Sequence, residues 1–359
     1  MTWECGAIDS GVAIFPDGKI RPCCQAAADY SKPLSSILDK DRFADIKKTD
    51  KPSACKACWS LEDDGFTSYR KFYTKGIGNT KITYLDFRHT NQCNLRCRYC
   101  GPHFSNRIAK ELNIMPSLKT VDLNPYLDDL LVDTVKDIYF TGGEPFISED
   151  HFTIISKLVE TGWSKNITLR YNTNMSVTSY KGNDFFDCWK HFKSVSLRIS
   201  LDAAGQELNY IRSGSSWDDV QSNIKKMIDG RSKNLEIMLA PVISNLNIWF
   251  LKDLVDFAKD NKLMITPTVL QGPDYLSVSA LPANLKQRAA DVLEQIKEDI
   301  DIEDYTKIKQ KMEVDDEPLF RHTIQHVLLL DKLRGENLFD LLPFTETAKQ
   351  TILRNYEYE

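Results

Sequence analysis

The chain has 359 residues, of which 42% are hydrophobic and 27% charged, values typical of globular proteins that exclude a disordered or fibrous chain. Its 46 Lys and Arg residues are outnumbered by 51 Asp and Glu residues, and the net charge of −5 disfavours nucleic acid as a partner. The chain has no apolar leader and no run of about eighteen apolar residues, so we expect a cytoplasmic protein without a membrane partner.

The residues fall into three predicted regions. Residues 1–78 carry five of the nine cysteines and one regular feature, a hairpin whose turn is Pro16–Gly18. We interpret this region as a small amino-terminal module. A central domain, 79–275, and a charged helical extension, 276–359, follow it.

The central domain alternates predicted strands with helices. Its helix over 217–229 begins after Ser216, a typical N-cap residue, and ends at Gly230. Six strands separated by helices require parallel pairing with right-handed crossovers, so we expect an α/β fold with a parallel sheet or an open barrel. The predicted strands are 82–88, 137–141, 166–173, 195–202, 235–243 and 264–270.

Three cysteines follow the first predicted strand. Cys93, Cys97 and Cys100 have the spacing C-x3-C-x2-C. Soft thiolates suit iron, and three of them on one short loop can hold three irons of a cubane cluster and leave the fourth open. An open coordination position is typical of a catalytic metal site, whereas a structural zinc site is the alternative. Cys188, further along, lies on a helical pattern that predicts a buried core thiol.

A second motif, Gly142-Gly143-Glu144-Pro145, ends the second predicted strand. The two glycines allow the backbone to approach a ligand closely. Glu144 offers a charged acceptor to an ammonium group.

The cysteine spacing, with Tyr99 before the third cysteine, resembles the signature of the radical S-adenosylmethionine (radical SAM) superfamily, and the second motif resembles its GGEP motif. The resemblance spans roughly residues 82–270. It implies a partial (β/α)6 barrel that binds a [4Fe–4S] cluster and S-adenosylmethionine. The implied reaction is reductive cleavage of S-adenosylmethionine to a 5′-deoxyadenosyl radical, which abstracts hydrogen from a substrate. The implied electron donor is a protein such as flavodoxin or ferredoxin.

The resemblance also implies a set of residues that contact S-adenosylmethionine. They are Tyr99, the GGEP residues at the amino group, Ser200 and Asp202 at the ribose, Arg212 at the carboxylate and Val242 at the adenine. A surface salt bridge is the alternative for Arg212, and ordinary core packing is the alternative for Val242.

The amino-terminal cysteines resemble a second family pattern. The spacing of Cys5, Cys23, Cys55 and Cys58 is similar to the twitch module, a shorter relative of the SPASM domain, and implies four ligands to an auxiliary [4Fe–4S] cluster. Cys24 could replace Cys23, and a four-cysteine zinc site is the alternative. The module commonly follows the barrel, whereas here it precedes it. Chain termini often lie close together, so the same placement beside the barrel is possible.

Alternation along the strands predicts a charged barrel interior. It directs Arg88, Arg170 and Arg198 inward, with Asp86 and Glu236 as acidic neighbours. Internal ion pairs are the simpler interpretation, because buried charges need partners. Alternatively, Arg170 or Arg198 is left over to bind a carboxylate or phosphate of the substrate.

The substrate class follows from analogy with radical SAM proteins that carry such modules. We expect a peptide or protein substrate, with a small polar metabolite or nucleotide as the alternative, and the reaction can be of the oxidoreductase or transferase type. A different alternative is an iron–sulfur electron carrier or sensor without catalytic activity.

Overall fold

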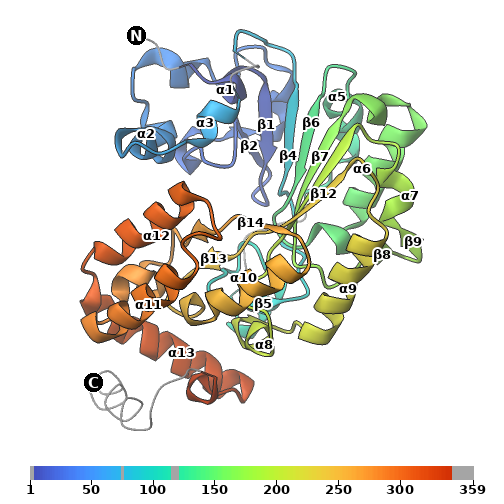
Figure 1. Cartoon of the computed structure of the whole chain (residues 1–359). Coiled ribbons are helices and arrows are strands. Elements are labelled where there is room, and N and C mark those ends of the chain that lie inside the picture. The colour runs from blue at the N-terminus through green and yellow to red at the C-terminus, as the bar shows by residue number, and fades with distance from the viewer. Residues whose placement is uncertain (1–3, 74–76, 115–120, 342–359) are drawn as a thin grey trace.

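The computed structural model describes residues 4–73, 77–114 and 121–341 of the chain (Figure 1). Residues 1–3 and 74–76 of the predicted amino-terminal module, and residues 342–359 of the predicted helical extension, therefore lie outside the described residues. Within the described ranges, no helix is long and apolar enough to cross a membrane.

A nine-stranded sheet forms the centre of the molecule, and six of its strands are the predicted parallel strands. They are β4 (Tyr84–Phe87), β6 (Asp137–Phe140), β7 (Thr168–Thr173), β10 (Ser194–Ile199), β12 (Leu235–Leu239) and β14 (Met264–Ile265). Each pairs in parallel with the next one along the chain. Every second residue of β7 and β10 is buried, because one face of the sheet packs against helices. The predicted α/β fold is confirmed.

The last two predicted strands are interrupted by proline. Pro241 separates β12 from β13 (Val242–Ile243), and Pro267 separates β14 from β15 (Thr268–Val269). Proline has no N–H to donate to a ladder, so each strand ends where it occurs. β13 and β15 then pair in parallel as a separate two-stranded sheet.

The amino-terminal hairpin joins the same large sheet. β1 (Gly11–Ile14) pairs in parallel with β4, and β2 (Lys19–Arg21) pairs antiparallel with β1. β3 (Lys32–Pro33) pairs with β2 at the edge of the sheet. The predicted boundary at residue 78 therefore separates two strands that are neighbours in one sheet.

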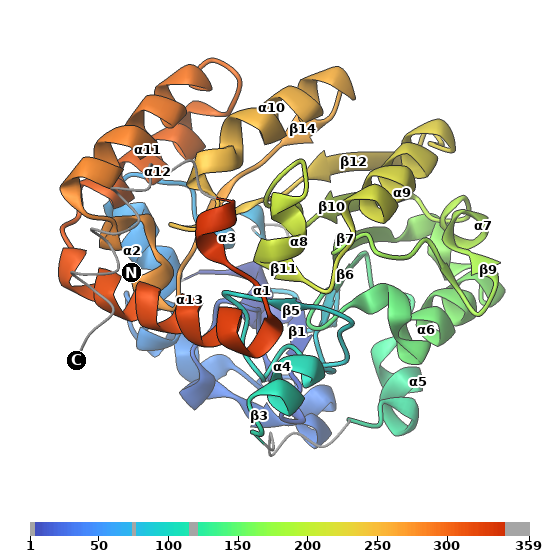
Figure 2. The ribbon, with the colours of Figure 1, turned by 90° about the horizontal axis from the view of Figure 1, so that it is seen from below.

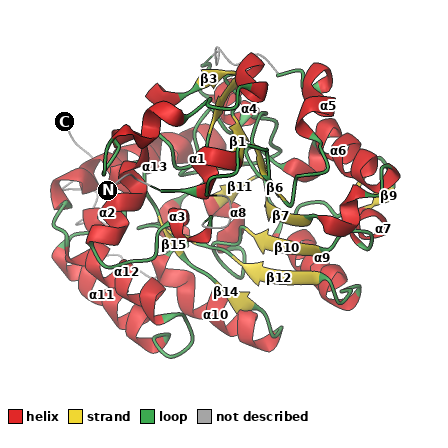
Figure 3. Ribbon diagram, turned by 90° about the horizontal axis from the view of Figure 1, so that it is seen from above, coloured by secondary structure: helices red, strands yellow, loops and turns green. Residues whose placement is uncertain are grey.

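Helices surround this sheet. Figure 3 shows α6, α7, α9 and α10 on the outer side of the curved row of strands. The described helices are α1 (Gly6–Ser10), α2 (Lys56–Asp63), α3 (Tyr69–Phe72), α4 (Asn106–Glu111), α5 (Leu127–Leu130), α6 (Glu149–Glu160), α7 (Phe185–Trp189), α8 (Glu207–Ile211), α9 (Trp217–Asp229), α10 (Leu251–Asp260), α11 (Ala283–Gln295), α12 (Ile302–Glu313) and α13 (Phe320–Arg334). The remaining short strands are β5 (Arg96–Cys97), β8 (Ser179–Tyr180), β9 (Asn183–Asp184) and β11 (Arg212–Ser213).

The predicted ends of α9 are confirmed, and the described part of the predicted extension contains α11, α12 and α13. The Ser216 hydroxyl accepts a hydrogen bond from the N–H of Asp219 at 3.3 Å, and Gly230 follows the helix. The amino-terminal region and helices α11 and α12 lie on the same side of the sheet (Figure 1), whereas α13 runs past β5 and β11 (Figure 2).

Candidate functional site

The cysteine loop follows β4 and is held at both ends by other segments. Cys97 lies in β5, where it pairs with Arg212 of β11. Ser105, which follows the loop, donates a hydrogen bond from its hydroxyl to the carbonyl of Leu95 at 2.7 Å and is also the N-cap residue of α4. These contacts give the loop a defined backbone conformation.

The GGEP motif packs against the backbone of this loop. The N–H of Glu144 donates to the carbonyl of Gln92 at 2.8 Å. A Cβ on Gly143 would lie 2.0 Å from that same carbonyl oxygen, and a Cβ on Gly142, whose φ is +104°, would lie 3.0 Å from the Cα of Arg88. The glycines therefore allow two protein loops to touch, and their expected role in backbone approach to a ligand stays a prediction.

The three thiols of the loop influence one another. Burial, followed by the neighbouring Cys97 thiol, raises the pKa of Cys93 and of Cys100 to about 12. Cys97 is buried, and its sulfur accepts a hydrogen bond from Nη1 of Arg212 at 3.8 Å.

The donor set of this loop fits an iron–sulfur cluster. Within the part of the chain that the structure describes, no three His, Cys, Asp or Glu side chains are arranged to hold a metal ion. A cubane presents a separate iron to each thiolate, so its ligands do not have to meet at one point. Three neighbouring thiols on one loop suit that arrangement, and binding would release their protons because iron takes thiolates.

Glu144 lies in the interior beside this loop, with 2% of its surface exposed. Its carboxylate accepts hydrogen bonds from the N–H of Asn174 and the hydroxyl of Thr173, both at 2.7 Å, and from the N–H of Phe146 at 3.1 Å. Burial nevertheless raises the pKa of Glu144 to about 7. A carboxylate in this position is stabilised by a bound cation such as an ammonium group.

We expect the ligand-free Glu144→Gln variant to gain stability relative to the wild type between pH 5 and pH 8. A carboxyl group whose pKa rises from 4.5 to about 7 on folding holds more protons in the folded than in the unfolded chain. The stability of the wild type therefore falls as the pH rises through this window, by about 3 kcal/mol in all. Urea unfolding at pH 5 and pH 8 measures the effect, and an unchanged difference between the two chains at both pH values would contradict it.

A second polar cluster joins the cysteine loop to the segments after the later strands. Asp202 is buried and accepts hydrogen bonds from the hydroxyl of Tyr99 at 2.5 Å and from the N–H of Val242 at 2.9 Å. Its carboxylate also pairs with Nε of Arg212 at 2.7 Å. Both partners are buried, so this pair is not the surface salt bridge considered for Arg212.

The other predicted cofactor residues lie around the same place. Ser200 is half-buried directly after β10, and its N–H donates to the carbonyl of Thr173 at 2.8 Å. Val242 is half-buried, and Pro145 is buried in the turn after β6. The structure thus gathers the predicted residues at the carboxyl ends of the parallel strands, where open α/β sheets bind ligands.

The barrel interior holds a cavity of about 1090 Å³. Polar side chains of the strands line it, as the alternation predicts. They include Thr168, Arg170, Asn172, Ser196, Arg198 and Glu236. The amino-terminal region contributes Cys24 and Tyr69 to the wall, and α12 contributes Asp304 and Lys307.

The three interior arginines differ in their partners. Arg88 pairs with Asp86 at 2.7 Å, and Arg170 pairs with Asp137. The prediction of internal ion pairs is therefore confirmed for these two. Arg198 has no carboxylate within ion-pairing distance among the residues that the structure describes, although its side chain lines the cavity.

The amino-terminal cysteines divide into two groups. Cys5, Cys23, Cys55 and Cys58 are all buried. Burial raises the pKa of Cys5 and of Cys23, and the Cys58 thiol contributes to both increases, so these three thiols lie near one another. Cys24 is only half-buried, and both Cys24 and Cys58 line the barrel cavity.

Cys188 differs from the buried core thiol that its pattern predicts. It is partly exposed in α7, a helix of five residues at the surface. The preceding Asp187 is largely exposed, so this face of the helix borders solvent.

The sequence patterns do not predict the role of Arg98, which lies between Cys97 and Tyr99. Its side chain is buried and points to α13, where it pairs with Asp331 at 2.6 Å and with Glu336. No local signal could reveal the contact, because Asp331 lies 233 residues further along the chain.

The geometry agrees with a comparison of the chain with protein families. Residues 87–258 match the model of the Radical SAM superfamily. The matched residues contain the cysteine loop, the GGEP motif and the pair of Asp202 and Arg212.

Curated relatives share part of the chain. A GTP 3′,8-cyclase of Helicobacter pylori is 25% identical over 65% of this chain and 68% of its own length. A GTP 3′,8-cyclase of Campylobacter jejuni is 28% identical over 52% of this chain and 55% of its own length. The chain thus spans between about half and about two thirds of the length of these relatives. The match to the family model and these relatives indicate an enzyme.

A solved structure is also similar in part. The crystal structure of Streptococcus suis SuiB bound to S-adenosylmethionine matches 59% of this chain and 48% of that chain, with 17% sequence identity and a TM-score of 0.38. This likeness is too low to support a conclusion.

Proposed function

We propose that the chain is a radical SAM enzyme in which Cys93, Cys97 and Cys100 hold a [4Fe–4S] cluster and leave one iron open to S-adenosylmethionine. When bound, these groups supply one-electron cleavage of the cofactor to a 5′-deoxyadenosyl radical. The observation that carries the proposal is the junction of the cysteine loop with the GGEP motif on one side and with Arg212 on the other. A purely structural metal site would not need a buried carboxylate and a buried guanidinium beside it.

The chain's own side chains would bind and orient the cofactor. Glu144 would accept a hydrogen bond from the cofactor ammonium, and that cation would keep it ionised. Arg212 would bind the cofactor carboxylate, while Asp202 holds the guanidinium in place. Ser200 and Asp202 would contact the ribose, and Val242 would contact the adenine.

A second [4Fe–4S] cluster is proposed at Cys5, Cys23, Cys55 and Cys58. The burial of all four thiols and the proximity of three of them support this ligand set. Cys23 is buried like the other three thiols and lies near Cys5 and Cys58, which favours it over the half-buried Cys24 as the ligand of the adjacent pair. Such thiol-rich sites suit a reducing compartment such as the cytoplasm.

The proposed substrate is a small polar anion of the nucleotide class, bound in the barrel cavity. The relatives named GTP 3′,8-cyclase favour this class over the peptide or protein expected from the sequence, which no comparison supports. The cavity offers Arg198, whose guanidinium makes no ion pair at contact distance in the described part of the chain, with Asp304 as a more distant acidic neighbour. The electron would come from a low-potential protein such as flavodoxin or ferredoxin.

Reconstitution without oxygen tests the proposal. The purified chain is loaded with iron and sulfide, reduced with dithionite and incubated with S-adenosylmethionine, and 5′-deoxyadenosine is quantified by chromatography. We expect 5′-deoxyadenosine to accumulate, and to accumulate faster when GTP is added as the probe nucleotide. An electron carrier or sensor would form none, and a peptide-modifying enzyme would not respond to GTP.

The Arg198→Ala variant should respond poorly to GTP. Loss of a charge-assisted, bidentate hydrogen bond to an anion weakens binding about tenfold to a hundredfold. The GTP concentration that gives half-maximal stimulation of cofactor cleavage should rise by that factor. Arg107→Ala, which changes an exposed arginine of α4, is the matched control. An unchanged GTP response of the Arg198 variant would exclude Arg198 from substrate binding.

A further inference from the structure

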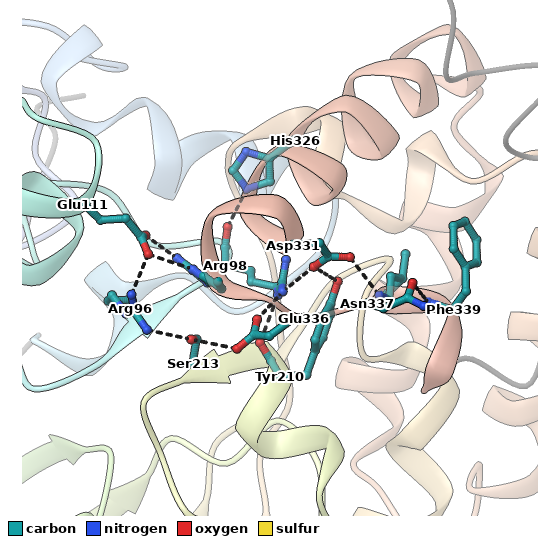
Figure 4. A network of polar contacts seen from close by, with 12 residues as sticks. Arg96, Arg98, Glu111, Tyr210, Ser213, His326, Asp331, Glu336, Asn337 and Phe339 are labelled. Atoms are coloured by element: carbon teal, nitrogen blue, oxygen red, sulfur yellow. Dashed lines mark hydrogen bonds and ion pairs between the residues drawn. The ribbon is translucent and has the colours of Figure 1, made fainter.

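Arg98 connects the cysteine loop to the carboxyl-terminal helix (Figure 4). It directly follows Cys97, yet its guanidinium points away from the thiols and is fully buried. Its Nε donates to the carbonyl of Tyr210 at 3.0 Å, and its guanidinium lies over the Tyr210 ring, 3.5 Å from the centroid. A buried guanidinium requires carboxylates close by, because an unpaired charge in the interior is strongly unfavourable.

Two carboxylates from the end of α13 and the residues after it supply that partnership. Asp331 accepts hydrogen bonds from Nη2 of Arg98 at 2.6 Å and from the hydroxyl of Tyr210 at 2.9 Å. Its other oxygen accepts from the N–H of Leu338 at 2.8 Å, which fixes the turn after the helix. Glu336 also binds Nη2 of Arg98, and it accepts from the hydroxyl of Ser213 at 3.2 Å.

Further contacts join α13 to the same loop. His326 lies 2.9 Å from the carbonyl oxygen of Arg98, to which its ring N–H donates. Arg334 pairs with Glu111 of α4 at 2.6 Å, and Glu111 also pairs with Arg96 at 2.7 Å (Figure 4). The helix therefore contacts the loop through its backbone and through side chains before and after Cys97.

We propose that Asp331 and Glu336 are positioning residues, which act through Arg98 to set the place of Cys97, Cys100 and Arg212 relative to one another. The inference rests on the proposed cluster at the cysteine loop. Arg98 is bonded to the segment Tyr210–Ser213, and that segment carries Arg212, whose guanidinium contacts the Cys97 sulfur and Asp202. Through Arg98, the two carboxylates thus fix the position of Cys97, a proposed cluster ligand, relative to Arg212, the proposed cofactor-binding arginine.

This role differs from simple packing of a terminal helix on a barrel. Asp331→Asn and Glu336→Gln preserve size but remove one negative charge beside a buried positive charge. The positive charge of Arg98 is then less compensated and stabilises the more negative, reduced cluster. The midpoint potential of the cluster should therefore become more positive. Displacement of Cys97 and Arg212 should weaken S-adenosylmethionine binding at least tenfold.

Thr323 offers a matched control on the same helix. Its hydroxyl donates to the carbonyl of Tyr275 and accepts from Asn245 at 3.2 Å, so it joins α13 to the barrel without contacting the cysteine loop. Thr323→Val removes these bonds and keeps the shape. If docking of the helix alone mattered, this variant would have the same effect on the cluster as the two carboxylate variants.

The experiment uses the full chain reconstituted without oxygen. For all variants we measure the iron content, the midpoint potential of the cluster at the cysteine loop and the dissociation constant of S-adenosylmethionine. The electron paramagnetic resonance spectrum of this cluster is recorded with and without S-adenosylmethionine. We expect a more positive potential and a weaker spectral response to the cofactor in Asp331→Asn and Glu336→Gln only. The Glu336 side chain is 26% exposed, so Glu336→Gln can answer the question even if Asp331→Asn does not fold.

Two results would overturn the inference. In the first, the wild type binds its cluster, and Asp331→Asn and Glu336→Gln have the same midpoint potential and the same cofactor affinity as the wild type. The other is a Thr323→Val variant that changes both quantities as much as they do. A wild type that retains no iron at the cysteine loop would overturn the proposed function as well, so the two failures are distinguishable.

Discussion

Gly143→Ala should lower the free energy of unfolding by about 4 kcal/mol or more, in the extreme range for a single substitution. The added methyl group would lie 2.0 Å from the carbonyl oxygen of Gln92. The two backbone segments cannot easily move apart to relieve this contact, because the hydrogen bond from the N–H of Glu144 to the carbonyl of Gln92 joins them. Urea unfolding of the ligand-free chain measures the effect.

Gly101 provides the control for this prediction. It lies in the same cysteine loop, and a Cβ there would meet nothing within 4 Å. Gly101→Ala should therefore change the stability by no more than about 0.5 kcal/mol. A Gly143→Ala variant that is as stable as Gly101→Ala would contradict the packing role assigned to the GGEP glycines.

Cys97→Ser should abolish the formation of 5′-deoxyadenosine and remove about four of about eight irons per chain. A serine hydroxyl is a poor ligand for iron, and the loop would keep only two of its three sulfurs. The irons proposed at the amino-terminal cysteines should remain, because these thiols lie in separate segments next to α1, after β2 and at the start of α2. Iron and sulfide analysis after reconstitution measures the loss.

Variants of the adjacent Cys23 and Cys24 test which of the two thiols is a ligand of the proposed second cluster. Cys23→Ser should remove the other half of the iron, whereas Cys24→Ser should keep the wild-type content, because Cys23 is buried near Cys5 and Cys58 and Cys24 is only half-buried. The reverse pattern would show that Cys24 is the ligand. Zinc in place of iron after purification without oxygen would contradict both proposed clusters.

The local patterns of the sequence predict the central fold well. Alternating burial along β7 and β10 and the cap at Ser216 follow from short-range chemistry, and the structure has them where the pattern places them. The single-strand interpretation of 235–243 and 264–270 fails at Pro241 and Pro267, whose missing N–H groups outweigh the apolar pattern around them.

Long-range partners could not be predicted in the same way. The alternation correctly brings Arg170 into the barrel interior, but Asp137 as its partner depends on the register of β6 and β7. The pairing of β1 with β4 likewise depends on tertiary packing, and so does the contact of Arg98 with Asp331. These features join residues that are distant in sequence, and a single sequence holds no local trace of them.

The shared sheet has a mechanical consequence. β1 is joined to β4 by four register pairs, from Gly11 with Tyr84 to Ile14 with Phe87, so the amino-terminal region cannot hinge away from the barrel as a rigid body without tearing a ladder. Beside the cavity, Glu303 of α12 accepts two hydrogen bonds from Thr67 and so joins this helix to the amino-terminal region. Lys307, followed by these bonds, lowers the pKa of Glu303 to about 2, so this contact keeps its charge at pH values where an ordinary glutamate is already protonated.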